Sequence, residues 1–566
     1  MSNFADFFLQ KVKIIRTSID TNLSSTKLIH ESLQYTPRSN LATFEQCNCD
    51  KIKRIIQCSK ATTCDLDPAP TDFIKLCIED LAPVITILCN KSFEETLMPV
   101  QLKKAIVRPR IKKVTADRDD LSNYRPVSNL AYVGKIIERV VLARLLDHLE
   151  RNGLNEVYQS AYKHNHSTES ALVRVQSDIL TALDRKQCVA LVLLDLSAAF
   201  DTIDHNILLD RLQMRIGIVG KALMWFQSYL RDRSYLVQVR REKSEKFDVK
   251  YGVPQGSVLG PVLFCMYLLP LGDILRRHKI QFHFYADDLQ MYLSFNCDDY
   301  QNSVIIMEKC IEEVQSWLSA NFLKMNKDKT EIMFIKSKRS RCPEMSSVVN
   351  ICNEEVEAST VVRNLGAIFD CHMSMDHHVS KICQSANFHL RKVALLKRYL
   401  TQDSLHTLVQ SLVISRLDYA NSLLAGAPAS QLQRLQKVQN HAARIITGVS
   451  SRAHVSHILI TLHWLPIEQR VMYKLACFVF KALHGLAPLY ISEMLELYRP
   501  KRTLRSQGDI KLLSVPRTNC VTFGDRAFAA AAPRVWNCLP REVRELSSYQ
   551  TFRKHLKTCL FKLAYH

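Results

Sequence analysis

The sequence predicts a mixed fold of helices and strands, the α+β class, and three observations predict it. Short apolar or alternating stretches between residues 188 and 292 are typical of strands. Amphipathic helical patterns lie on both sides of them, and from residue 376 onward the pattern is almost entirely helical. A chain of 566 residues is too long for one hydrophobic core, so we expect several subdomains.

The chain is strongly basic, with 76 Lys and Arg against 55 Asp and Glu and a formal net charge of +21. An excess of this size indicates a polyanionic partner, and a basic protein without such a partner is the alternative. Hydrophobic residues make up 47%, which excludes a disordered chain. No apolar window reaches the ~18 residues that a membrane span needs, and the N-terminus lacks the pattern of a signal peptide. We therefore expect no membrane partner.

Eighteen cysteines occur without any CxxC pair. Many stand in apolar runs, among them Cys188, Cys265 and Cys477, which is typical of buried, reduced thiols in an intracellular protein. The cysteines from Cys47 to Cys64 offer ligands for zinc, but their spacing matches no common zinc signature. Thiols without a metal are the favoured interpretation of that stretch, and zinc binding is the alternative.

The N-terminal part is predicted in two pieces. Residues 1–64 are polar and of mixed pattern, and we interpret them as a linker or extension without a clear core. Residues 65–120 are predicted as a helical extension, because apolar residues from Thr71 step by one, three or four positions. Pro83 is expected to kink or divide this helix. The basic run 102–113 is either a strand and loop that contacts phosphates or a solvated loop.

Hydrophobic periodicity also predicts the central elements. In chain order they are an amphipathic helix (132–149), a buried strand (188–196), a strand hairpin (235–253), a second amphipathic helix (307–318) and three further helices (379–396, 405–424, 432–446). Residues 376–447 hold nine Lys or Arg and three Asp, a local charge of +6. Such a basic helical subdomain suits contact with the phosphates of a duplex, and a bundle with a solvated basic face is the alternative.

Two adjacent aspartates, Asp287 and Asp288, stand between strand-like flanks in the stretch FHFYADDLQMY, and Asp195 follows another apolar strand. If these strand ends converge, their carboxylates supply the oxygen ligands that Mg²⁺ prefers. Two such ions roughly 4 Å apart stabilise the attacking and the leaving oxygen in phosphoryl transfer. The alternative for the pair alone is an ordinary Asp-Asp hairpin turn.

Two further motifs accompany the carboxylates. Asp195 lies in LLDLSAAFDTIDH (Leu193 to His205), with Phe200 five residues later. GVPQGSVLGP (Gly252 to Pro261) holds three glycines and two prolines before an apolar segment. Glycines at this density permit a close approach of the backbone to a ligand, although an ordinary loop before a helix has the same composition.

These three stretches resemble the polymerase motifs of reverse transcriptases, most of all those of non-LTR (LINE-type) retrotransposons of the broad Jockey-like group. The resemblance continues upstream in NYRPVSNL and QSAYKHNHSTESAL, and downstream in WLSANFLKMNKDKTEIMFI and NLGAIFD. C-terminal pieces such as FGDRAFAAAAPRVWNCLP resemble the ends of the same polyproteins. The resemblance covers about residues 65–566 and is firmest over 120–370.

The resemblance implies a right-hand polymerase and the activity of an RNA-directed DNA polymerase. Fingers and palm, the latter with an antiparallel sheet, would occupy residues 121–370, a helical thumb 371–450, and a mostly helical C-terminal region of the polyprotein 451–566. The implied partners are an RNA template, a DNA primer and deoxynucleoside triphosphates. The endonuclease that precedes the polymerase in such elements is expected to be missing from this chain.

The resemblance also assigns roles to single residues. Asp195 and Asp287 would bind two Mg²⁺ ions, or Mn²⁺ as an alternative, with Asp288 as an accessory acid and the backbone carbonyl of Leu196 as a further ligand. Phe200 would act as a steric gate against the sugar 2′-hydroxyl, with a plain core phenylalanine as the alternative. The remaining expected contacts are to the nucleotide (Lys163, Gln255, Gly256, Lys324, Lys329) and to template or primer (Arg125, Ser257).

Some of these expectations have explicit competitors. Lys163 stands where many relatives have Arg, so it would meet a triphosphate as a point charge and without a bidentate fork. Lys324 and Lys329 are otherwise solvated lysines. Polymerases that make RNA usually have Gly where Ala286 stands, and a decayed or domesticated nucleic-acid-binding protein is the non-enzymatic alternative. An intracellular protein is expected, and residues 336–341 are either a nuclear signal or a solvated loop, which leaves nucleus and cytoplasm open.

Overall fold

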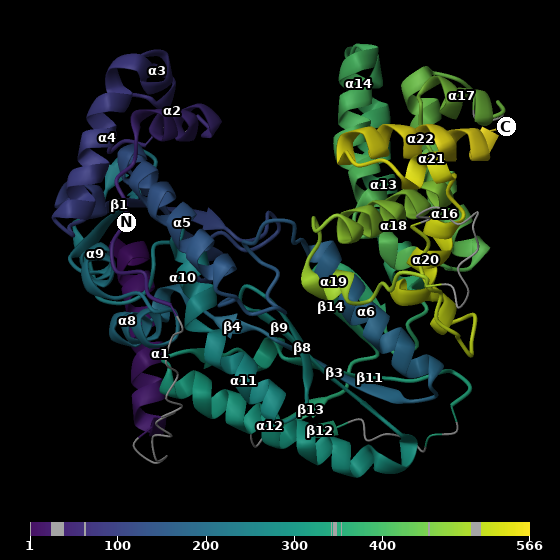
Figure 1. Cartoon of the computed structure of the whole chain (residues 1–566), viewed down its shortest axis with the longest axis horizontal. Helices are drawn as coiled ribbons and strands as arrows, with labels where there is room; N and C mark the ends of the chain where they lie inside the picture. The colour runs from purple at the N-terminus through teal and green to yellow at the C-terminus, as the bar shows by residue number, and fades with distance from the viewer. Residues whose placement is uncertain are drawn as a thin grey trace. The chain divides into compact units, whose positions relative to one another are not determined.

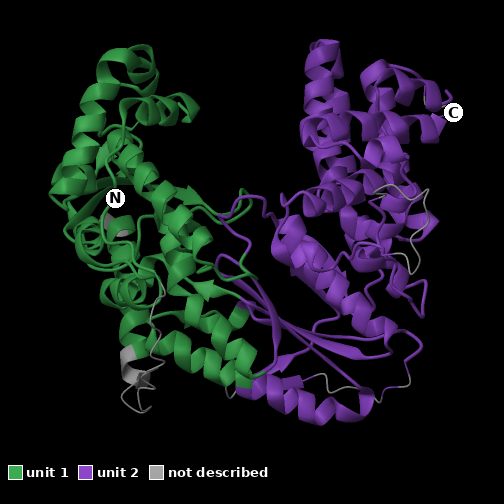
Figure 2. Cartoon of the chain, in the orientation of Figure 1, with its two compact units in different colours: residues 1–159, 195–278, 310–328 green, residues 160–194, 279–309, 329–566 purple. Residues whose placement is uncertain are grey.

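The computed structural model describes residues 2–23, 39–61, 64–340, 342, 348–351, 354–450, 453–499 and 511–565. The chain divides into two compact units, which Figure 2 shows in different colours. Unit 1 comprises residues 1–159, 195–278 and 310–328, and unit 2 comprises residues 160–194, 279–309 and 329–566. Each unit thus combines segments that lie far apart in the sequence.

Unit 1 is built on a sheet of order β2-β1-β5-β6, with β7 also paired to β5. β1 pairs antiparallel with β2 and parallel with β5. The short strands β4 and β10 form a separate pair. The strands are β1 (Lys104–Ile111), β2 (Tyr124–Leu130), β4 (Leu196–Ser197), β5 (Arg233–Val239), β6 (Glu242–Lys243), β7 (Phe247–Val249) and β10 (Lys324–Met325).

Ten helices lie wholly within the described residues of unit 1, and several enclose an aromatic core around Trp225. Its ring is fully buried and contacts Phe44 and Phe93 from two other segments. The helices are α1 (Ser2–Leu23), α2 (Cys49–Cys58), α3 (Thr71–Leu76), α4 (Ile78–Glu94), α5 (Tyr132–Arg151), α7 (Ala199–Thr202), α8 (His205–Met214), α9 (Gly220–Leu230), α10 (Gly260–Tyr267) and α11 (Leu269–Arg277). α12 (Tyr300–Ala320) supplies residues to both units.

Unit 2 contains an antiparallel sheet of order β11-β3-β9-β8, whose strands carry neighbouring labels in Figure 1. Six of the seven residues of β3 are buried, as expected for a central strand covered on both faces. α6 packs against β3 and β8. The strands of this unit are β3 (Cys188–Leu194), β8 (Gln281–Tyr285), β9 (Asp288–Phe295), β11 (Glu331–Ile335) and the two hairpins β12 (Val348–Ile351) with β13 (Glu354–Glu357) and β14 (Val361–Asn364) with β15 (Ala367–Asp370).

The helices of unit 2 pack into one helical assembly that includes the C-terminal residues. α13 contacts α16, α16 contacts α18, and α18 contacts both α20 and α22. The helices are α6 (Thr168–Asp184), α13 (Asp376–Leu396), α14 (Gln402–Val409), α15 (Ser415–Asp418), α16 (Ala429–Thr447), α17 (Ser456–Thr461), α18 (Ile467–Leu483), α19 (Leu489–Ser492), α20 (Phe528–Asn537), α21 (Arg541–Arg544) and α22 (Tyr549–Tyr565).

The predicted α+β class is confirmed, and the central elements form as predicted except for the helix over 405–424. The expected helix at 132–149 is α5, the buried strand is β3, and the hairpin from residue 235 is β5 paired with β7. The basic run 102–113 contains β1, which favours the strand over the loop. The hydrophobic pattern was informative because α5 has a buried and an exposed face, whereas β3 is a continuous apolar run that is buried along its length.

Three expectations for helices and the N-terminus are wrong. Residues 1–64 do contribute to a core, because Phe8 of α1 packs on Val107 and Val237 of the sheet. The expected division at Pro83 is wrong, because the helix from Thr71 is divided at Cys77 and Pro83 lies inside α4; a kink at Pro83 stays a prediction. A proline in the second turn removes only one backbone hydrogen bond there. The helix predicted over 405–424 is interrupted by a π turn at Gln410–Ile414 and ends at α15.

The cysteines also depart from expectation. Cys188 and Cys477 are buried thiols as predicted, whereas Cys265 is a thiol that is only partly buried. Cys297 and Cys342 form a disulfide. Their Cα atoms lie 5.2 Å apart although 45 positions separate them in sequence, a pairing that spacing alone does not disclose. No helix in the described ranges has the length and apolar character that crossing a membrane requires.

Candidate active site

The β8–β9 hairpin presents the aspartate pair. Tyr285 and Asp288 are the last paired residues of the two strands, so Ala286 and Asp287 form the two-residue turn. Ala286 has a φ of +57°, the left-handed conformation that such tight turns require. Asp287 is half-buried, whereas Asp288 is exposed and already belongs to β9. The two neighbouring carboxylates therefore occupy unlike positions.

The end of β3 leads directly to the third aspartate. Leu194, the last residue of β3, pairs with Leu289 of β9, and Asp195 follows Leu194 in the chain. In unit 1 the backbone carbonyl of Asp195 accepts a hydrogen bond from the Asn326 amide at 2.8 Å, and its carboxylate accepts one from Asn326 Nδ2 at 3.1 Å. Asn326 thus orients Asp195, a contact that sequence reasoning did not identify.

β4 fixes the residues after Asp195. Leu196 pairs with Met325 and Ser197 with Lys324, so Leu196 and Lys324 are held by the same short antiparallel pair. The Leu196 side chain is buried, whereas Lys324 is exposed. Of the predicted site residues, the structure brings Asp195, Leu196 and Lys324 together in unit 1.

The GVPQGSVLGP loop is joined by backbone hydrogen bonds to the segment that contains Phe200. The Val253 amide donates to the Phe200 carbonyl at 2.9 Å, and the Gln255 carbonyl accepts from the Ser128 amide of β2 at 2.7 Å. Gln255 Nε2 lies 2.9 Å from each carboxylate oxygen of Asp201. Phe200, Gln255, Gly256 and the buried Ser257 thereby belong to one hydrogen-bonded part of unit 1.

The surroundings of Phe200 bear on its predicted interpretation as a core residue, and the steric gate stays a prediction. Its ring stacks on the buried ring of Phe264 with the centroids 4.5 Å apart, as a core residue would. It nevertheless stays partly exposed. The stacking restricts the ring to one orientation, which is what a side chain that discriminates by shape needs.

A buried carboxylate on α5 accepts hydrogen bonds from the same loop. Glu138 of α5 is 1% exposed and accepts hydrogen bonds from the amides of Val258 at 2.6 Å and Leu259 at 3.0 Å. The Tyr229 hydroxyl donates to it at 3.3 Å. Burial raises the pKa of Glu138, while the nearby Arg233 guanidinium and these donors oppose the rise. The only sequence signal for Glu138 is an acid on the apolar face of a helix.

Gly256 permits the close approach of this loop to β2, and a methyl group there has no room. Its φ is +131°, and a Cβ added to it would overlap the carbonyl oxygen of Ser128. We expect Gly256→Ala to lower the free energy of unfolding by about 2–4 kcal/mol in urea titrations. The matched control is Gly153→Ala, whose φ is +61° and whose Cβ would meet open space. That change should cost only about 1 kcal/mol. Equal losses for both variants would contradict the steric explanation.

A cavity of about 600 Å³ adjoins these residues within unit 1. Asp201, Gln255 and Ser128 contribute to its wall, and so do cations from α1 and the sheet, including Lys11 and Arg233. A cavity wall that mixes backbone, amide and cationic groups is suited to an anionic, hydrogen-bonding ligand.

Arg16 fastens α1 beside this cavity. Its guanidinium lies over the rings of Tyr251 and Phe322, at 3.6 and 3.8 Å from their centroids. It donates to the Thr202 carbonyl at 3.1 Å and to the Asp204 carboxylate at 2.8 Å. The predicted linker therefore contributes an anchored helix to the region around the motifs.

Asp201 gives the folded state a pH dependence. Burial raises its pKa to about 6 from an ordinary value of 3.8, with hydrogen bonding from Gln255 and the charge of Lys11 opposing the rise. Because the folded pKa is the higher one, the stabilising contribution is present below about pH 4 and is lost as the pH rises through about 6. Since Asp201 lines an open cavity, screening reduces the loss to about 1–2 kcal/mol.

We therefore expect Asp201→Asn to flatten the pH dependence of unfolding. Between neutral pH and about pH 4, the free energy of unfolding of the variant should rise by less than that of wild type. Urea titrations of both proteins across that pH range measure the two changes. Parallel curves for the two proteins would contradict the assignment.

The predicted nucleotide contact Lys163 lies in unit 2, three residues beyond a buried network. The Ser160 amide donates to the Phe284 carbonyl of β8 at 3.0 Å, and Ser160 Oγ lies 2.7 Å from His283 Nε2. The Tyr490 hydroxyl lies 2.7 Å from the same Ser160 Oγ. Burial lowers the pKa of His283 to about 3, which keeps its ring neutral. Tyr490, a C-terminal residue, is a contact that sequence reasoning missed.

The other two predicted cations, Lys329 and Arg125, lie on different elements. Lys329 is exposed at the end of the 3₁₀ turn Lys327–Lys329, just before β11. Arg125 is exposed on β2 in unit 1, where it is paired in register with Arg110 of β1. Two adjacent arginines on one hairpin repel each other unless an anion lies between them.

The zinc alternative for Cys47–Cys64 finds no support among the described residues. Cys47 Sγ lies 3.2 Å from Asn90 Oδ1, and hydrogen bonding with Cys89 together with the charge of Arg144 lowers the pKa of the Cys47 thiol to about 7. In the described ranges, one group of three metal-binding side chains lies close enough together to hold an ion, and it includes none of the cysteines from Cys47 to Cys64.

The comparisons with known proteins agree with these motifs. Residues 111–369 match the family model described as reverse transcriptase (RNA-dependent DNA polymerase). The resemblance inferred from the motifs is thereby confirmed.

The chain is similar to three polymerases from transposons of Drosophila melanogaster. It is 27% identical over 369 residues to the "Probable RNA-directed DNA polymerase from transposon X-element", which is 64% of this chain and 40% of the relative. It is 24% identical over 444 residues to the corresponding protein of transposon BS (76% and 48%) and 23% identical over 396 residues to that of mobile element jockey (66% and 41%). The chain thus spans less than half the length of these curated relatives.

Proposed function

We propose that this chain is an RNA-directed DNA polymerase that copies the RNA of a non-LTR retrotransposon into DNA. The match of residues 111–369 to the reverse transcriptase family carries this proposal. The names of the similar transposon proteins and the charge of +21 support it. The substrates would be an RNA template, a DNA primer and deoxynucleoside triphosphates, and the protein would act inside the cell.

The proposed metal ligands are Asp195, Asp287 and the carbonyl of Leu196, with Asp288 in a supporting position. Along the chain, Asp195 directly follows Leu194 and Asp288 directly precedes Leu289, the residue with which Leu194 is paired. All donors are oxygen atoms, which suits Mg²⁺ and also Mn²⁺. When bound, the ions would stabilise charge on the attacking and leaving oxygens of phosphoryl transfer.

The chain's own residues would position the reactants. The half-buried Asp287 on a tight turn and Asp195, which hydrogen-bonds to Asn326, need little reorganisation, and preorganised charge is the main source of such catalysis. We propose that Phe200, Gln255 and Gly256 contact the nucleotide together with Lys163, Lys324 and Lys329. Arg125 and Ser257 would contact template or primer.

Primer extension on an RNA template with Mg²⁺ tests the function. We expect wild type to extend a DNA primer with deoxynucleotides and Asp287→Ala to extend none. The alternative function, nucleic-acid binding without catalysis, predicts retained template binding and equally poor extension by both proteins. That result would reject the proposal.

Phe200 allows a separate test of nucleotide choice. Shortening it to alanine should remove a steric barrier to the 2′-hydroxyl and lower the preference for deoxynucleotides over ribonucleotides by about 10–100-fold in kcat/KM. Phe264→Leu, which changes the ring that Phe200 stacks on, serves as the control for a general packing defect. An unchanged preference in Phe200→Ala would favour the core interpretation of this residue.

A further inference from the structure

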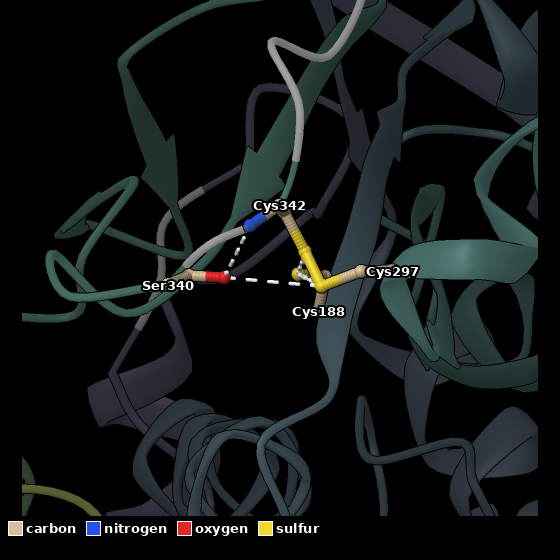
Figure 3. The surroundings of a disulfide bond; sticks show 4 residues. All are labelled: Cys188, Cys297, Ser340 and Cys342. Carbon is tan, nitrogen blue, oxygen red and sulfur yellow. Dashed lines mark hydrogen bonds between the residues drawn. A yellow bond between two sulfur atoms is a disulfide. The ribbon is translucent and has the colours of Figure 1, made fainter.

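Three cysteine sulfurs lie together at one end of the sheet in unit 2 (Figure 3). They belong to Cys188, Cys297 and Cys342, and all three Sγ atoms lie within 4.8 Å of one another. Cys188 Sγ is 3.3 Å from Cys342 Sγ and 4.0 Å from Cys297 Sγ. In the structure Cys297 and Cys342 are joined as a disulfide, and Cys188 is a free, buried thiol beside it.

The sheet brings these residues to one place. Cys188 is the first residue of β3 and pairs with Phe295, the last residue of β9, two positions before Cys297. β11 ends at Ile335, opposite Val189, and the chain then reaches Cys342. The sulfurs thus mark the end of β3 that is about 20 Å from Leu194, given the rise of a strand. They lie away from the aspartate turn.

A disulfide alone does not account for this arrangement. It uses two sulfurs, whereas a third sulfur from a segment 109 residues from Cys297 reaches the same point. Zn²⁺ binds thiolates at about 2.3 Å in tetrahedral geometry, which places its sulfur ligands roughly 3.8 Å apart. The two separations from Cys188 lie on either side of that value. No second group of three close metal-binding side chains was found among the described residues.

The surroundings add a polar group and a positive charge. Ser340 Oγ lies 3.8 Å from Cys297 Sγ and accepts from the Cys342 amide at 3.3 Å. Burial raises the pKa of the Cys188 thiol, while Ser340 and the charge of Lys336 oppose the rise. A divalent ion would offset the negative charge of three thiolates far better than one lysine.

We propose that Cys188, Cys297 and Cys342 form a binding site for a thiophilic divalent cation, zinc, once the disulfide is reduced. A dithiol reductant supplies two electrons and two protons to the Cys297–Cys342 bond, which gives three thiols. Binding of the ion then releases three protons and forms three metal–sulfur bonds. Water or Ser340 completes the coordination. The ion would join the ends of β3 and β9 to the segment after β11.

Cobalt(II) is the probe for this site, because thiolate-bound Co²⁺ absorbs strongly in the near ultraviolet and Zn²⁺ displaces it. The reduced full-length chain, freed of reductant without air, is titrated with Co²⁺ and then with Zn²⁺. We expect one Co²⁺ per chain with thiolate absorption and its loss on adding Zn²⁺. Cys188→Ser and Cys342→Ser should each weaken binding about 10-fold or more. Cys477→Ser, which changes a buried cysteine of the same unit outside the group, should bind as wild type does.

A second measurement separates metal binding from folding. Zn²⁺ should raise the Tm of the reduced wild type and of Cys477→Ser, but not that of Cys188→Ser or Cys342→Ser. Cys342→Ser gives the same information should Cys188→Ser fail to fold. The proposal is overturned if reduced wild type shows no thiolate absorption with Co²⁺. It is equally overturned if Cys188→Ser and Cys342→Ser both bind Co²⁺ as wild type does. That result would mean that Cys297 and Cys342 form a disulfide and that the three cysteines are not a metal site.

Discussion

Replacing Asp195 by asparagine is expected to slow RNA-templated primer extension by about 10³-fold or more, because the neutral side chain no longer attracts the divalent ions proposed to neutralise charge in phosphoryl transfer. The fold should persist, since the asparagine oxygen can still accept the hydrogen bond from Asn326 Nδ2 and the backbone bond between the two residues is unchanged. Single-turnover extension rates and urea titrations on the same preparations measure the two effects separately.

The matched control for this change is Asp210→Asn, which removes one negative charge from an exposed position of α8 in the same unit. It should extend primers within about two-fold of wild type, as expected of a surface change. Undiminished extension by Asp195→Asn would refute the proposed ligand role of Asp195. Loss of extension together with loss of stability would reassign Asp195 to folding.

Glu138→Ala is expected to destabilise the protein by about 3–5 kcal/mol, the largest stability loss that we predict. The change leaves the amides of Val258 and Leu259 without their acceptor and the positive charge of Arg233 without a nearby carboxylate. Buried donors that lose their partner carry the full cost of desolvation. Urea denaturation of purified protein measures the change, and the loop that carries Gln255 should become more accessible to protease.

Glu150→Ala is the control for that prediction, because Glu150 lies on the same helix α5 but is exposed. Its removal should change the free energy of unfolding by no more than about 0.5 kcal/mol. If the two alanine variants were equally stable, the hydrogen bonds to Glu138 would contribute nothing net to the fold.

The strands and turns near the proposed site could be predicted from sequence because their determinants are local. The alternating flanks of Asp287 predict two strands, and only two residues remain for the turn between them. The apolar run that ends at Leu194 predicts a central strand for the same reason. The family motifs then assign roles to residues inside these elements.

The supporting contacts could not be predicted, because each joins residues far apart in sequence. Glu138 meets its loop across 120 positions, and Tyr490 meets Ser160 across 330. Nothing in the local pattern of either residue names its partner. The same limit applies to the cysteines: periodicity predicted a buried Cys188 but not which sulfurs lie beside it.

The hydroxyl of Tyr490 is shared between Ser160 Oγ at 2.7 Å and Ser170 Oγ at 2.8 Å, next to the buried ring of His283. A chain cut or recombined between residues 450 and 490 would leave the two buried serine hydroxyls without that partner. The residues that depend on one another for this network therefore extend beyond the stretch that the family model matches, residues 111–369.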